Sequence, residues 1–153
     1  MNPKADPPKD GKLNHSKGLI IPNLNPDVIE FAKSLSCTWL GAVHVTPKPH
    51  CKIWDCHNNA INYTEWYGGQ RILGYYLLKC LDSHRLLAIL HSIVRTENGE
   101  LMDVTPFDDN RTYNMFTILQ DQSPNYSISE IWSQKTHSQA SVCKQLTLSR
   151  MIS

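Results

Sequence analysis

Two long apolar segments lie close together near the middle of the chain, and they constrain its fold more than any other feature. Residues 71–80 and 86–96 are rich in Leu, Ile and Tyr, and only a short polar connection separates them. Runs of this length and composition, bounded by turn-forming residues, are typical of buried strands. So short a connection joins neighbouring antiparallel strands. The sequence therefore predicts an antiparallel sheet at the centre of the fold.

A second hairpin is expected directly after the first. Residues 97–99 (Glu-Asn-Gly) are typical of a three-residue loop with the glycine in the left-handed conformation. Residues 100–105 then form the returning strand, which Pro106 stops. A loop of this length pairs Thr96 with Glu100, and this register fixes which side chains of the two strands meet.

Helical signals precede these strands. Residues 25–27 (Asn-Pro-Asp) supply a cap, a first-turn proline and a first-turn acid, and apolar residues then recur at helical spacing to about Ser36. A strand is expected over residues 37–46. A second helix is expected behind Asp55, from Cys56 to about Tyr67, because a Gly-Gly pair follows at the position where helices end. The expected fold class is therefore α+β.

The pattern weakens after Pro106. Residues 113–119 are expected to form a last strand or a packing arm. Residues 121–153 are rich in Ser, Gln and Asn, with scattered apolar positions. Within them, residues 141–151 are predicted to form a short helix.

Length and composition indicate one domain. The chain has 153 residues, of which 41% are hydrophobic and 19% charged, as in ordinary globular domains. Residues 1–18 are polar and rich in Pro and Lys, so they are predicted to be a flexible N-terminal tail. Residues 19–153 are then a single domain of catalytic type, with its core over residues 25–119.

Charge and hydropathy exclude several classes of partner. The formal net charge is only +1, which gives no electrostatic footprint for nucleic acid. No apolar run approaches the roughly 20 residues that span a bilayer. The N-terminus lacks the apolar stretch of a secretory signal, so a cytoplasmic location is expected, with export by a signal-less route as the alternative. Nothing implies an organic cofactor, and oligomeric state is left open.

The cysteines are expected to be reduced. Their number, five, is odd, and the chain is longer than the small domains that disulfides hold together. Free cysteine is usually a small buried hydrophobe. Structural roles are therefore predicted for four residues in apolar strand or tail contexts: Cys37, His44, Cys80 and Cys143.

Cys56 differs from the other cysteines because it follows a good N-cap residue, Asp55, in the first turn of the second helix. Free N–H groups and the helix dipole stabilise a thiolate at that position and lower the pKa of the thiol. The thiolate is the nucleophilic form. Cys56 is therefore the candidate nucleophile.

His91 and Asp103 supply a candidate base and a group to orient it. His91 lies in an otherwise apolar strand, and Asp103 lies in the expected returning strand. A buried carboxylate needs a partner, because leaving it unpaired is costly. In the register of the three-residue loop, Asp103 is the diagonal neighbour of His91 on the same face. Cys56, His91 and Asp103 then form a nucleophile, base and orienter.

The order of these features resembles the transglutaminase-like branch of the papain-like thiol enzymes, in which a Cys-bearing helix precedes a His strand, a glycine turn and an Asp-Pro-Thr-like segment. The matching residues are Cys56, His91, Gly99, Asp103 and Thr105. The Trp-Asp-Cys sequence at residues 54–56 also resembles the start of the active-site helix in NlpC/P60 peptidases, and the motif order is similar to that of small bacterial and phage proteins.

This resemblance implies a papain-like or transglutaminase-like fold, with the Cys-bearing helix packed on an antiparallel sheet. It also implies acyl transfer through a thioester, with a protein or peptide amide as substrate. The product would be that of a peptidase, amidase, deamidase or transglutaminase. Two positions depart from the family pattern: His57 replaces a small residue, and Ile93 replaces an aromatic one. Both departures bear on substrate class.

Further candidates surround the nucleophile. The backbone N–H of Cys56 is one expected oxyanion donor, and the loop before it, through the side chain of His50, is a candidate for the second. Trp54, His57 and Asn58 are candidates for lining the site.

Two other interpretations of these residues compete with the thiol site. His50, Cys51, Cys56 and His57 are possible zinc ligands, since structural zinc sites favour Cys and His. A non-catalytic protein-binding module on the same fold is the second alternative. It would use aromatic residues, most of which are otherwise expected in the core: Trp39, Trp54, Trp66, Tyr67, Tyr75 and Tyr76.

Overall fold

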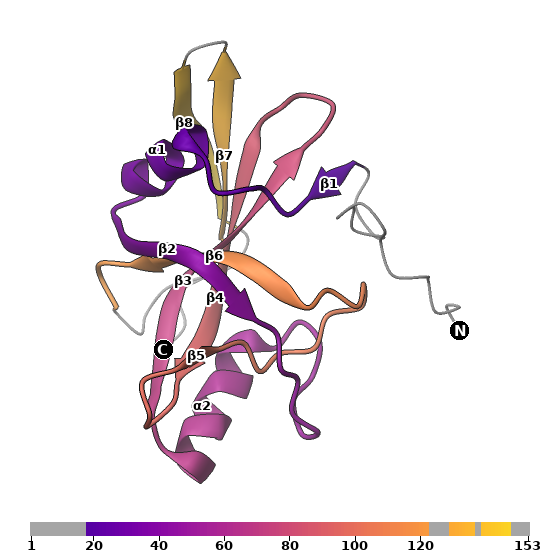
Figure 1. Cartoon of the computed structure of the whole chain (residues 1–153), viewed down its shortest axis with the longest axis vertical. Helices are drawn as coiled ribbons and strands as arrows, with labels where there is room; N and C mark the ends of the chain where they lie inside the picture. The colour runs from indigo at the N-terminus through magenta and orange to yellow at the C-terminus, as the bar shows by residue number, and fades with distance from the viewer. Residues whose placement is uncertain (1–17, 123–128, 137–138, 148–153) are drawn as a thin grey trace.

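The computed structural model describes residues 18–122, 129–136 and 139–147, and its architecture is α+β (Figure 1). The elements in chain order are β1 (Leu19–Ile20), α1 (Pro26–Ser34), β2 (Cys37–His44), α2 (Cys56–Tyr67), β3 (Gln70–Cys80), β4 (Leu86–Arg95), β5 (Leu101–Met102), β6 (Tyr113–Leu119), β7 (Ser129–Thr136) and β8 (Gln139–Thr147). The strands form one sheet in the order β2-β6-β3-β4-β7-β8, and β1 and β5 pair with β3 and β4.

The predicted central hairpin is present. β3 and β4 pair along their length in antiparallel register, with Gly74 opposite His91. Their side chains are buried on both faces for most of the hairpin. This explains why the two segments are apolar throughout and do not alternate between apolar and polar residues.

The predicted loop after β4 is also present. The N–H of Thr96 donates to the carbonyl of Glu100 at 2.8 Å, and Gly99 has a φ of 89°, in the left-handed region. Val94 therefore pairs with Met102, as the three-residue loop requires.

The returning strand is shorter than predicted, because β5 ends at Met102. From the next residue the chain turns to β2, where the N–H of Asp103 donates to the carbonyl of His44 at 3.0 Å. The carbonyl of Asp103 accepts from the N–H of Thr46 at 2.7 Å, and Val45 and Asp103 form a parallel bridge. Backbone partners at the end of β2 and just after it thus take the place of the expected ladder with β4.

Two parts of the C-terminal half differ from the sequence prediction. β6 is a strand, as one of the two alternatives had it, and it lies inside the sheet between β2 and β3. The short helix predicted over residues 141–151 is wrong for residues 141–147, which belong to β8. Pairing with β7 supplies the backbone of β8 with strand partners and overrides its weak helical pattern. Residues 148–151 and the predicted tail at 1–17 lie outside the described residues.

Both predicted helices are present, and they lie at opposite ends of the sheet (Figure 1). The side chain of Asn25 accepts from the N–H of Val28 at 3.0 Å and caps α1, as expected. α2 starts at Cys56 and ends where Gly68 has a φ of 83°. Asp55 makes no side-chain bond to the helix backbone and instead accepts from the amide of Asn58 at 2.9 Å.

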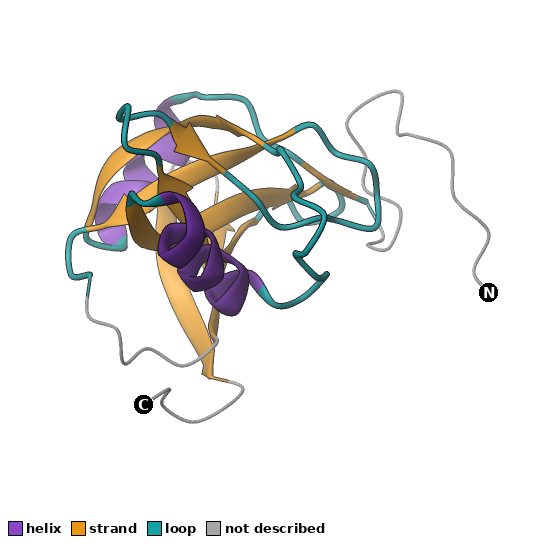
Figure 2. Ribbon diagram, turned by 90° about the horizontal axis from the view of Figure 1, so that it is seen from below, coloured by secondary structure: helices purple, strands orange, loops and turns teal. Residues whose placement is uncertain are grey.

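Three apolar clusters hold the layers together. The first joins α1, through Val28 and Phe31, to one face of the sheet. The second lies on the other face around Ile93 and Phe116. The third is small and fixes α2, through Ala60, against β4. Figure 2 views the molecule from the end that carries α2 and shows that helix in front of the strands.

Neither α1 nor α2 is long and apolar enough to cross a membrane, and no other helix occurs among the residues that the structure describes.

Gly74 is expected to be essential to the centre of the sheet. A Cβ at this position would lie 2.1 Å from the carbonyl oxygen of Thr117 and 2.6 Å from the ring of Phe116. We expect Gly74→Ala to lower the free energy of unfolding by about 1–3 kcal/mol, because neither neighbour has room to move. Urea denaturation measures this.

Gly41→Ala is the matched control, because Gly41 also lies in a strand but faces only the far end of the exposed Trp39 ring. That ring is free to rotate away, so a change within about 0.5 kcal/mol is expected. Equal losses in the two variants would contradict the packing argument.

Candidate active site

The expected contact between His91 and Asp103 is present in the structure. Nε2 of His91 lies 2.8 Å from Oδ2 of Asp103, and both side chains are buried. The contact arises from two features together. The hairpin loop sets the register, and the bridge to Val45, the residue after β2, then places Asp103 beside Nε2 of His91.

Asp103 is held by hydrogen bonds besides that of His91. Oδ1 accepts from the backbone N–H of Thr105 at 3.1 Å, and Oδ2 accepts from Nδ2 of Asn114 at 3.0 Å. Three donors from three segments thus converge on one buried carboxylate. These bonds fix its orientation.

A second buried ion pair supports Asn114. Asp109 and Arg111 are buried, and Arg111 donates to both carboxylate oxygens of Asp109, at 3.0 and 2.6 Å. Nη1 of Arg111 donates to Oδ1 of Asn114 at 2.7 Å. Asn114 therefore accepts from the guanidinium and donates to Asp103, which leaves its amide one orientation.

Aromatic rings enclose His91. The rings of Tyr76, Phe107 and Phe116 have their centroids 5.0, 5.6 and 6.3 Å from the imidazole. The guanidinium of Arg111 also lies over Phe107, at 4.1 Å. These rings keep water from the base and strengthen its interaction with Asp103.

Cys56 begins α2, as predicted, and is partly buried. Its side chain lies within hydrogen-bonding reach of His91 and of His57. Burial raises the pKa of the thiol, but the charge of His91 and the hydrogen bonds of the two imidazoles outweigh burial and lower the pKa to about 6. At neutral pH the side chain is therefore mostly thiolate.

The pKa of His91 shifts in the opposite direction to that of Cys56. Burial lowers the pKa of its imidazole, but the Asp103 carboxylate and the Cys56 thiolate raise it to about 10. Because Nε2 is bound to Asp103, Nδ1 is the nitrogen left for the thiolate. Between about pH 6 and pH 10 the pair is thiolate and imidazolium.

The start of α2 lies against an edge of β4 that other strands leave open. β7 pairs with β4 at residues 87–89 and β5 pairs with it at residues 94–95, so residues 90–93 have no partner strand on that side within the described chain. Successive residues of a strand point to opposite faces. Cys56 meets His91 on one face, and its neighbour His57 meets Ser92 on the other.

The structure does not bring every expected site residue to Cys56. The ring of His50 packs 4.4 Å from that of Trp66, ten residues further along α2 and so about 15 Å along the helix axis. Trp54 is 72% exposed, with a φ of 66°. Asn58 is exposed and bonds to Asp55. His57, by contrast, lies within hydrogen-bonding reach of Cys56.

Asn59 is a site residue that the sequence did not reveal. It is buried, its amide donates to Oγ1 of Thr105 at 3.0 Å, and it exchanges bonds with the backbone of Lys52. It thus ties α2 to the segment that carries Asp103. One feature of the sequence could have identified Asn59: it lies three residues after Cys56, on the face of α2 that packs on the sheet. No sequence feature identifies Asn114, Asp109 or Arg111 as buried, because their burial depends on distant strands.

The zinc alternative finds no support in the geometry. Among the residues that the structure describes, no three His, Cys, Asp or Glu side chains gather closely enough to hold a metal ion. The described cysteines are free thiols, and burial raises the pKa of Cys37 to about 11, in keeping with a structural role. The side chain of Cys143 is outside the described residues.

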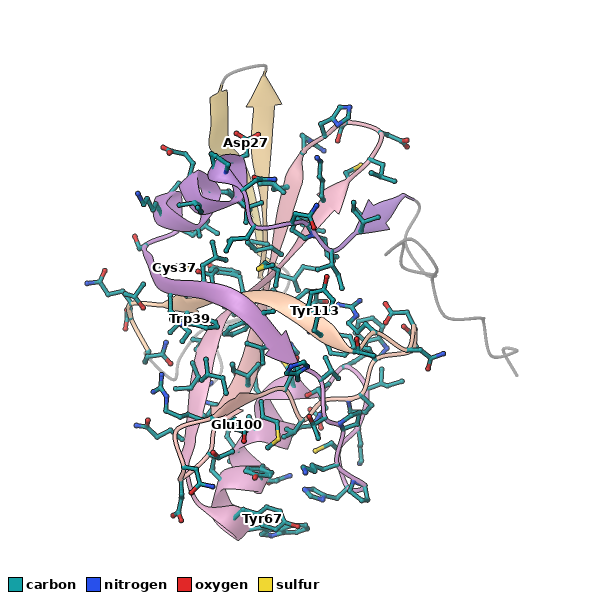
Figure 3. The ribbon with its side chains drawn as sticks, in the orientation of Figure 1. Asp27, Cys37, Trp39, Tyr67, Glu100 and Tyr113 are labelled. Carbon is teal, nitrogen blue, oxygen red and sulfur yellow. The ribbon has the colours of Figure 1, made fainter. Side chains whose placement is uncertain are left out.

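The aromatic residues are divided between core and surface. Tyr75 and Tyr76 are buried, as expected. The expectation that most of the six lie in the core is wrong, because the four others are exposed large side chains: Trp39, Trp54, Trp66 and Tyr67. Figure 3 shows Tyr67 at the end of the molecule formed by the last turn of α2.

Alkylation of the thiols by iodoacetamide should identify Cys56 by its pH dependence. Its rate should rise tenfold per pH unit up to about pH 6 and level off above, because the thiolate reacts and the thiol does not. Burial raises the pKa of Cys51, so the alkylation rate of Cys51 should still be rising at pH 9. Peptide mapping by mass spectrometry follows both in one sample. A Cys56 profile centred near pH 9 would contradict the ion pair.

The contribution of Asn114 can be measured through stability. Asn114→Ala leaves a buried guanidinium N–H and the Asp103 carboxylate each short of one partner, so we expect a loss of about 2–3 kcal/mol in the free energy of unfolding. Asn58→Ala, an exposed amide, should change it by less than about 0.5 kcal/mol. Chemical denaturation gives both values, and a tolerated Asn114→Ala would show that the network is not stabilising.

Comparison with known proteins leaves these observations without a relative to interpret them: no protein-family model, curated protein or solved structure matches the chain. What the site can do is therefore argued from its own geometry.

Proposed function

We propose that the protein is a cysteine-dependent hydrolase or acyltransferase that acts on an amide carbonyl through a thioester. The observation that carries the proposal is the convergence of Cys56, His91 and Asp103 from three separate elements, with the thiol ionised and the imidazole protonated near neutral pH. A nucleophile, a proton carrier and an orienting carboxylate are the parts that acyl transfer needs.

In the first half-reaction the thiolate of Cys56 attacks the amide carbon, and the carbonyl electrons move to oxygen. The backbone N–H of Cys56, in the first turn of α2, is free of the helix's own bonds and can donate to that oxyanion. The tetrahedral intermediate collapses, Nδ1 of His91 protonates the departing amine, and a thioester remains on Cys56.

In the second half-reaction the neutral imidazole accepts a proton from the incoming nucleophile. That nucleophile attacks the thioester, and the thiolate leaves. Water as acceptor makes the protein a peptidase, amidase or deamidase, and an amine makes it a transglutaminase. Asp103 accepts from Nε2 of His91 and keeps that nitrogen protonated, which orients Nδ1 toward the sulfur.

The order of the elements supports a papain-like or transglutaminase-like fold for this site. A helix that begins at the nucleophile is followed by a strand with the base, a glycine turn and the acid. In this chain the carboxylate belongs to Asp103, which no longer pairs with β4 and forms a bridge with Val45 instead. A protein or peptide amide is the substrate class that this resemblance favours.

Labelling with a peptidyl acyloxymethyl ketone, an electrophile that traps acyl-transferring thiols, tests the proposal. Cys56 should be modified at neutral pH, and His91→Gln should reduce its rate at least 100-fold, because the imidazolium is lost and the thiol regains an ordinary pKa. Intact-protein mass spectrometry and peptide mapping give the rate and the site.

Gln at position 91 is chosen because its amide can still donate to Asp103, so the carboxylate is not left buried without a partner. Cys51→Ser is the matched control and should label at the wild-type rate. Asp103→Asn should also slow labelling, because an amide there no longer selects the required tautomer. Equal labelling of wild type and His91→Gln would remove the triad.

A further inference from the structure

His57 has a partner that fixes the position of its proton. Its Nδ1 hydrogen-bonds to the hydroxyl of Ser92, which is fully buried on β4. The same hydroxyl oxygen accepts from Nη1 of Arg71 on β3, at 3.4 Å. Because a guanidinium is always a donor, the hydroxyl oxygen is the acceptor in that bond.

The hydroxyl proton of Ser92 then goes to His57. Within the described chain, Nδ1 of His57 is the acceptor available to that proton. A neutral imidazole that accepts at one nitrogen carries its proton on the other. The pair Arg71 and Ser92 therefore selects the His57 tautomer in which Nε2 is an N–H donor.

That donor is buried, and no nitrogen or oxygen atom of the described residues accepts from it. The Cys56 thiolate lies within its reach, and that interaction ends when the sulfur attacks a carbonyl carbon. A buried donor left without an acceptor is costly, and native structures retain such groups where a ligand or reaction supplies the acceptor. The ring that carries it borders the Cys56 sulfur, at the residue next to the backbone N–H already available to an oxyanion.

We propose that His57 is a second catalytic residue, whose Nε2–H donates to the oxyanion formed on the carbon attached to Cys56. The inference rests on the proposed acyl transfer and adds to it the donor that its oxyanion requires. The oxyanion is two bonds from the sulfur, and two donors are the usual number for such an oxygen. The proton stays on His57, so His91 still performs every proton transfer.

Two reactions of Cys56 separate this role from simple stabilisation of the thiolate. Iodoacetamide alkylates the sulfur by displacement of iodide, with no oxyanion, whereas p-nitrophenyl acetate acylates it through a tetrahedral oxyanion and releases p-nitrophenolate. Each full-length variant is assayed at the pH where its own alkylation rate has levelled off, so that the thiol is ionised in all of them. The rate of Cys56→Ser is subtracted as the background.

His57→Phe should alkylate within about threefold of wild type and acylate about 100- to 1000-fold more slowly. The amide of His57→Gln can accept from Ser92 and donate to the oxyanion. This variant should therefore acylate only about tenfold more slowly than wild type. Ser92→Ala removes the hydroxyl that selects the His57 tautomer. Its acylation rate should fall about tenfold, and its alkylation rate should not change. This variant keeps the test open if His57→Phe does not fold.

The outcomes distinguish the inference from the function it rests on. If wild type acylates no faster than Cys56→Ser, the proposed function fails. If wild type acylates but His57→Phe loses alkylation and acylation by the same factor, His57 serves only the thiolate and the inference is overturned. A His57→Phe variant that keeps both rates would also overturn it.

Discussion

The hydrogen-bonded pair of His91 and Asp103 is the constraint on which the rest of the structure depends. A carboxylate with no exposed surface is tolerated only when its partners are complete. The partners come from β4, from β6 and from the turn that follows Asp103, so the pair requires all of these segments to be in place at once. The same requirement explains why the chain leaves the β4–β5 ladder at Met102 and crosses to β2.

Burial of one charged group leads to burial of others. Asn114 donates to Asp103, and its carbonyl is then free to accept from Arg111, which in turn needs Asp109. The result is a continuous polar network through the interior, enclosed by aromatic rings. In such surroundings each hydrogen bond is stronger than in water, and each missing one is more costly. This network holds the imidazole in one position.

The lowered pKa of the Cys56 thiol has a different origin, in the way α2 meets the sheet. Two consecutive residues at the start of that helix lie on either side of the open edge of β4. Cys56 reaches His91 on one face, while His57 is fixed by Ser92 on the other. A single helix terminus therefore brings together a thiolate, its backbone N–H and a neighbouring imidazole. The β-strand alternation makes this possible, because adjacent residues of β4 present opposite faces to the helix.

The sequence by itself determined the local structure and the first partners of the site. The composition of β3 and β4, the capping of α1, the start of α2 at Cys56 and the left-handed Gly99 are local properties, and all are present as predicted. The loop length also set the hairpin register that directs Asp103 toward His91, because hairpin register is set by the turn. The backbone bonds of Asp103 to His44 and Thr46, which complete the placement, depend on the tertiary structure. The tertiary structure alone decided what lies around that pair. The central place of β6, the burial of Asp109 and Arg111, and the separation of His50 from Cys56 depend on contacts between segments far apart in the chain. No local pattern encodes such contacts.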